Sequence, residues 1–164
     1  MAVLISHGCS QQLSQQAKGN GASSPDEIGF QLHTSLKEDN FSSLVYYTPD
    51  SQVIREYYAI ETNNQDADTK RNIRHYAQHI TEQLEQEFRQ ARQKATSGGL
   101  DWERAGLDSV DVRHSADNPR FANVLIYLME NGDSYQLATT CVRIEKRWYI
   151  SENIRFVEGS KKDE

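Results

Sequence analysis

Two histidines on the longest predicted helix have the spacing of metal ligands. His75 and His79 are four residues apart, so on a helix they share one face, and Glu82 follows three residues later. Two histidines in this arrangement can bind one metal ion. The sequence supports no third ligand, and this face borders the solvated side of the helix. We therefore expect surface histidines here, with no metal or cofactor.

Polar residues on the predicted strands are candidates for acid–base chemistry. They are Asp111, His114, Glu152 and Arg155, with Asn123 as a neutral companion. A carboxylate held in a dry cavity has a raised pKa and can act as a base. No spacing fixes an Asp–His pair, and polar residues on strands more often face water. A catalytic site therefore requires two or more of these groups to converge in a closed pocket.

A hairpin signal indicates the strands on which these polar residues lie. Asn131-Gly132 separates two β-rich runs and is typical of a two-residue type I′ turn. A slip of one residue would turn the whole apolar set outward, so the register is well determined. The pairs expected on the core face are Leu128–Tyr135, Ile126–Leu137, Val124–Thr139 and Ala122–Cys141. Further strands over 107–114 and 148–157 complete an antiparallel sheet of about four strands.

The second face of this hairpin is also apolar. A sheet that is apolar on both faces needs a layer packed on each face, because soluble proteins rarely expose a large apolar area to water. The chain's own loops, a ligand or another subunit can supply that cover. We expect a homodimer through this face, with the interface residues Phe121, Leu125, Tyr127, Val142 and Ile144.

Helices are predicted upstream of the sheet. Ser24 can cap the first helix, Pro25 suits its first position, and Glu27 can complete a capping box. Ser97-Gly98-Gly99 ends the longest helix. The expected ranges are 25–36, a short helix over 41–45, 51–62 as helix at first and extended later, and 69–96.

Size and charge narrow the class of protein. The chain has 164 residues, which suits one ordinary domain with a tail, and a hydrophobic fraction of 37% is enough for one core. The net charge of −6 argues against a nucleic-acid partner, which would need a basic surface. No run approaches the roughly 20 apolar residues that span a bilayer.

The N-terminal segment resembles the end of a bacterial lipoprotein signal peptide. A short apolar run, Ala2–Ile5, leads to Gly8 and then Cys9, the candidate lipidation site. Ser10 after the cysteine is similar to the pattern that favours the outer membrane of Gram-negative bacteria. Residues 1–24 are then a truncated signal and a flexible tether, 25–158 the domain, and 159–164 a charged tail. The alternative is a cytoplasmic N-terminus with a chance cysteine.

Two segments resemble the NTF2-like (cystatin-like) superfamily, in particular its small bacterial envelope members. "LHTSLKEDNFSSLVYYTPD" (Leu32 to Asp50) resembles the first helical pair, and "GDSYQLATTCVRIEKRWYISENIRF" (Gly132 to Phe156) resembles the closing hairpin, although Lys146-Arg147 stands where that turn has Gly. The resemblance implies an α+β cone, a curved antiparallel sheet wrapped by helices around a cavity, and no particular reaction.

Two functions fit such a domain. The first is a non-catalytic binding or assembly module at the bacterial envelope, lipid-anchored on the periplasmic side, that binds a small ligand or a protein partner. The alternative is a small-molecule enzyme of isomerase or dehydratase type, with acid–base residues in the cone. The two-sided apolar sheet favours the module, because binding needs only a cavity or an apolar patch.

Overall fold

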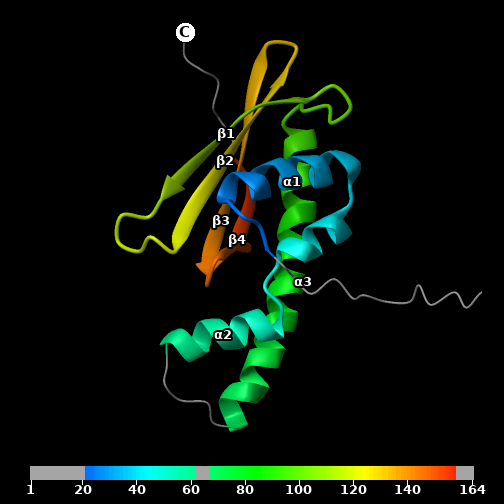
Figure 1. Cartoon of the computed structure of the whole chain (residues 1–164). Helices are drawn as coiled ribbons and strands as arrows, with labels where there is room; N and C mark the ends of the chain where they lie inside the picture. Colours follow the sequence, from blue (N-terminus) through cyan, green and yellow to red (C-terminus); the bar gives the residue numbers. More distant parts are fainter. Residues whose placement is uncertain (1–20, 62–66, 158–164) are drawn as a thin grey trace, which may run out of the picture.

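The computed structural model describes residues 21–61 and 67–157. Helices pack on a four-stranded antiparallel sheet with the strand order β1-β2-β3-β4, so the predicted α+β fold is confirmed (Figure 1). The elements are α1 (Pro25–Glu38), η1 (Phe41–Tyr47, a 3-10 helix), α2 (Ser51–Glu61), α3 (Ala67–Ser97), β1 (Gly106–His114), β2 (Phe121–Glu130), β3 (Asp133–Ile144) and β4 (Arg147–Val157).

The β2–β3 hairpin has the predicted register. Asn131 and Gly132 have positive φ angles of 51° and 90°, as a type I′ turn requires. All four expected core-face pairs are present, from Leu128–Tyr135 to Ala122–Cys141. Cys141 is fully buried, and burial raises the pKa of its thiol far above the ordinary value.

The main core lies between the sheet and the helices α1 and α3, which run along the same side of it (Figure 1). Leu32 of α1, Phe88 of α3 and Ile126 of β2 are all buried there. Gly29 allows α1 to approach the sheet closely, because a Cβ at this position would lie 2.6 Å from a methyl carbon of Val110. Close packing of this kind fixes where α1 lies over β1 and β2.

The start of α1 differs from the predicted capping box. Ser24 is the N-cap residue, but its side chain makes no capping hydrogen bond. The Glu27 carboxylate instead accepts hydrogen bonds from the backbone N–H and the hydroxyl of Ser23, each at 2.8 Å. These two bonds hold the pKa of Glu27 below its ordinary value, the backbone bond most strongly. The reciprocal bond therefore forms one residue earlier than expected.

β4 departs from simple alternation. Its pairing with β3 shifts twice, between Ala138 and Cys141, and Asn153 has a φ of 64°. Glu152 is therefore exposed, whereas Ile150 and Ile154, two residues away on either side, are buried. The Glu87 carboxylate of α3 accepts a hydrogen bond from the Ile154 N–H at 3.0 Å, which holds this irregular backbone in place.

The sheet is strongly curved, as the cone description requires. The rings of His114 on β1 and Trp148 on β4 have centroids 5.6 Å apart. These are the first and last strands of the sheet, and neighbouring strands lie about 4.8 Å apart. This contact between the two edge strands indicates that the sheet curls around the core.

α2 remains helical to Glu61, so the extended stretch predicted after its first turns is wrong. It lies near the lower end of the sheet and beside the first half of α3 (Figure 1), and its Ile54 belongs to the main core. Val53 of α2 packs on Val142, Ile144 and Tyr149 in a second, smaller apolar cluster.

A candidate apolar binding pocket

An open apolar pocket lies where α2, α3 and the end of the sheet meet. Its volume is about 120 Å³. The lining side chains come from the start of α2, from α3 and from three strands: Pro49, Ile54, Tyr57, Tyr76, Ile80, Phe121, Val142, Ile144 and Ser151. Apolar cavities of roughly 150 Å³ are large enough to bind a benzene ring. This pocket is somewhat smaller but open to solvent on one side, so one small ring or one branched aliphatic group can enter it with part of its surface still in water.

The start of α2 is fixed by local hydrogen bonds, and this places one wall of the pocket. The Asp50 carboxylate accepts hydrogen bonds from the N–H groups of Gln52 and Val53 at 2.8 and 2.9 Å, as an N-cap does. The Thr48 hydroxyl donates to the Val45 carbonyl at 2.9 Å and closes the preceding turn. Ile54 follows on the first turn of α2 and faces the pocket.

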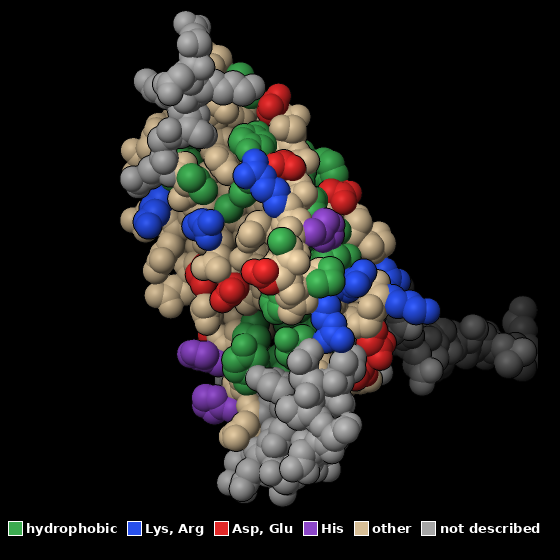
Figure 2. Space-filling view, turned by 90° about the vertical axis from the view of Figure 1, so that its left-hand side faces the viewer, with side chains coloured by type: hydrophobic (Ala, Val, Ile, Leu, Met, Phe, Trp, Pro, Cys, Tyr) green, Lys and Arg blue, Asp and Glu red, His purple; other side chains and the backbone are tan. Residues whose placement is uncertain are grey.

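The pocket is electrically neutral. None of the described residues that line it is a histidine or a carboxylate. Burial raises the pKa of the neighbouring Tyr149 phenol above its ordinary value of 10.0, so this group is uncharged at neutral pH. Figure 2 shows the sheet side of the molecule, where hydrophobic side chains gather toward the lower end. A neutral wall of this kind favours an apolar guest over a charged one.

The four catalytic candidates do not line this pocket. The Asp111 carboxylate pairs with Arg113 at 2.8 Å, and its side chain is 45% exposed. His114 is exposed and lies against Trp148, while Glu152 and Arg155 are exposed on β4. Within the described residues, no hydrogen bond or ion pair joins any two of the four. The structure therefore does not bring them together.

Thr140, a neutral residue, has polar partners on the face of the sheet away from α1. The Thr140 hydroxyl lies 3.3 Å from the Asn123 side-chain oxygen and 3.5 Å from the Asn153 amide nitrogen. This row crosses β2, β3 and β4 on the side of the sheet away from α1. Sequence alternation places Asn123 and Thr140 on one face, but the contribution of Asn153 depends on the irregular pairing of β4.

His75 and His79 lie side by side on α3, as their spacing predicts. Their ring centroids are 6.4 Å apart and both residues are exposed. The part of the chain that the structure describes contains no group of three or more His, Cys, Asp or Glu side chains arranged to hold a metal ion. The candidate lipidation site, Cys9, lies outside the described residues.

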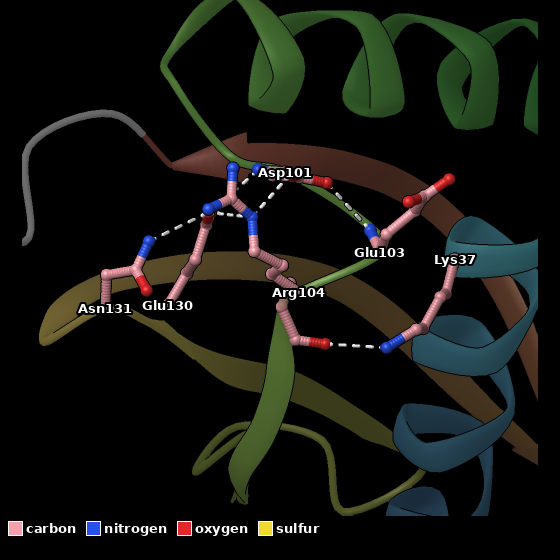
Figure 3. A network of polar contacts seen from close by, with 7 residues as sticks. Lys37, Asp101, Glu103, Arg104, Glu130 and Asn131 are labelled. Carbon is pink, nitrogen blue, oxygen red and sulfur yellow. Dashed lines mark hydrogen bonds and ion pairs between the residues drawn. The ribbon is translucent and has the colours of Figure 1, made fainter.

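Among the described residues, Glu130 is the one buried carboxylate, and no sequence pattern predicts its role. It accepts a hydrogen bond from the Asp101 N–H at 2.7 Å, and Arg104 lies 3.8 Å away (Figure 3). Arg104 also donates to the Asp101 carboxylate at 2.7 Å, which lowers the pKa of Asp101. This network fastens the α3–β1 connection to the end of the β2–β3 hairpin. It lies away from the pocket and its role is structural.

The predicted interface face is divided between two environments. Val142 and Ile144 are buried, and α2 of the same chain covers them. Phe121 packs partly against the same cluster, and Leu125 and Tyr127 are partly buried farther along β2. Less apolar surface is therefore left for a homodimer interface on this face than the alternation predicts, because α2 of the same chain already buries part of it.

Comparisons of the chain with protein-family models, with curated proteins and with solved structures give no match. The NTF2-like resemblance therefore stays a prediction from the sequence. Among the described residues, no helix is both long and apolar enough to cross a membrane.

Proposed function

We propose that this domain is a non-catalytic binding or assembly module of NTF2-like type, and that the pocket between α2, α3 and the sheet is its binding site. The observation that carries this proposal is the composition of the pocket wall. Its described lining is apolar and phenolic apart from one hydroxyl, and the ionisable candidates lie elsewhere on exposed surface. Such a wall can bind an apolar group but offers no acid or base to transform it.

The volume and the wall define the class of ligand. A space of about 120 Å³ admits one ring or one short branched chain. Tyr57 and Tyr76 contribute aromatic faces, and Ser151 adds a hydroxyl that already donates to the Thr140 carbonyl at 3.1 Å. The ligand is therefore a small apolar molecule or a single apolar side chain of a protein partner.

Calorimetric titration with 4-methylphenol tests the site. The probe carries one ring and one hydroxyl, so it matches the size and chemistry of the wall. We expect weak, saturable binding to the wild-type chain, and loss of that binding in Ser151→Phe, whose ring would occupy the pocket. Ser134→Phe is the matched control. Ser134 lies at the start of β3, whereas the pocket lies at the end of that strand, so this variant should keep the wild-type affinity. Equal affinity in all three proteins, with folding intact by circular dichroism, would contradict the proposal.

The location is a separate part of the proposal. We propose that the native protein crosses the inner membrane of a bacterium and is held at the envelope by a lipid on Cys9, which suits a binding module on a tether. Mass spectrometry of protein purified from its own host should find a diacylglycerol-modified cysteine at the new N-terminus. Protein that retains Met1 with an unmodified Cys9 would exclude the lipid anchor and favour a cytoplasmic location.

A further inference from the structure

β1 is an edge strand whose outer side meets no strand among the described residues. It pairs with β2 on one side, and the sheet order ends with it. An edge strand presents a row of unpaired N–H and C=O groups that can pair with another chain. The pairing of β1 with β2 is irregular between Leu107 and Ser109 and regular from there to His114. The regular stretch is the part of the edge that suits a partner strand.

The charges on this stretch are arranged for pairing with a second copy of itself. Asp111 and Arg113 flank Val112 and point to the same face, with their charged atoms 2.8 Å apart. In an antiparallel pair centred on Val112, Asp111 lies opposite Arg113 of the partner subunit, and Arg113 opposite the partner's Asp111. Four charges of alternating sign then surround the two-fold axis, and opposite charges on facing strands stabilise the pair.

Apolar surface lies on the other side of the same edge. Val110 and Val112 are only partly buried, although they face the core helix α1. Phe30 of α1 is 51% exposed, the most exposed large apolar side chain among the described residues. Lys37, two helical turns after Phe30, donates to the Ala105 carbonyl at the start of β1. Phe30 therefore lies on the side of α1 that is turned toward β1.

We propose that the chain forms a two-fold homodimer by antiparallel pairing of β1 with β1 of a second copy, centred on Val112. The pairing joins two four-stranded sheets into one. It buries the valine pair at the axis and brings Phe30 of each subunit close to the joint. This interface differs from the α2-covered face that the sequence favours, and it does not depend on the pocket.

Sedimentation velocity of the full chain across the micromolar range tests the proposal. Asp111→Arg and Arg113→Asp each place like charges opposite one another at two points of the interface, and each should weaken dimerisation about tenfold or more. The double variant D111R/R113D restores opposite charges and should recover the wild-type dimerisation constant. Arg155→Glu, an exposed reversal on the opposite edge strand, is the control and should change nothing.

Several results would overturn this interface. A wild-type chain that stays monomeric at high micromolar concentration excludes it. Single variants that dimerise as well as wild type, or a folded double variant that fails to recover, also exclude it and point to another surface. The β1 variants should bind 4-methylphenol normally, so failure of the dimer and failure of the pocket proposal are distinguishable.

Discussion

At the scale of single residues, two buried polar groups differ in whether they have hydrogen-bond partners. Glu130 is hidden from water but has the Asp101 N–H, Arg104 and the Asn131 amide as partners. The His33 Nε2 atom is buried without a hydrogen-bond partner among the described residues. A satisfied buried carboxylate adds stability, whereas an unsatisfied ring nitrogen makes stability depend on pH.

Replacing Glu130 should destabilise the fold. Glu130→Ala removes the charged acceptor of the Asp101 N–H and should lower the free energy of unfolding by about 2 kcal/mol. Glu103→Ala is the control, because its exposed side chain lies in the same loop while only its backbone N–H contacts Asp101. Urea unfolding at pH 7 measures both. Equal losses in the two variants would show that the Glu130 network contributes nothing specific.

His33 should make the protein less stable in mild acid. Burial, and then the nearby Lys37 charge, lower the pKa of His33 below its ordinary value of 6.5. The unfolded chain therefore binds a proton more readily than the folded one, so stability is full above pH 6.5 and is lost as the pH falls below it. Urea unfolding at pH 7.5 and pH 5 should show a smaller loss in His33→Leu than in the wild type. The exposed His79→Leu should lose as much as the wild type.

At the scale of elements, the sequence predicts what local chemistry determines. The β2–β3 register follows from Asn131-Gly132 and alternation alone, and Gly99, with a φ of 99°, is the second residue after α3. The irregular β4 was not predictable, because its backbone is held by Glu87, which lies 67 residues earlier in the chain. The Ser23–Glu27 bond was missed by one residue, since either serine satisfies the same pattern.

The hydrogen bond between Glu87 of α3 and Ile154 of β4 should contribute measurably to the free energy of unfolding. Glu87→Ala leaves the Ile154 N–H without its acceptor and should lower the free energy of unfolding by about 1.5 kcal/mol. Glu85→Ala is the control. Glu85 lies two residues before Glu87 and pairs with Arg89 on the surface, so its loss should lower the free energy of unfolding by less than about 0.5 kcal/mol. Backbone amide exchange should also speed up at Ile154 in the first variant alone. Unchanged exchange there would contradict the assigned role of Glu87.

At the scale of the whole molecule, the pocket could not be predicted from the sequence. Its wall combines residues from α2, α3 and three strands, and the sequence does not show how far α2 reaches past the sheet. One signal was present: Val53, Ile54 and Tyr57 make an apolar stripe on α2 that needs a partner surface. The four ionisable candidates were found by residue type, but the fold leaves them apart.

Binding in the α2–α3 pocket, away from the ionisable residues, can be observed residue by residue. Methyl-labelled protein titrated with 4-methylphenol and followed by NMR tests it most directly. We expect the methyl resonances of Ile54, Ile80 and Val142 to shift and those of Val110 and Val112 of β1 to stay unchanged. Shifts confined to methyl groups near Asp111, such as those of Leu125, would place the ligand beside the ionisable residues and exclude the pocket as the binding site.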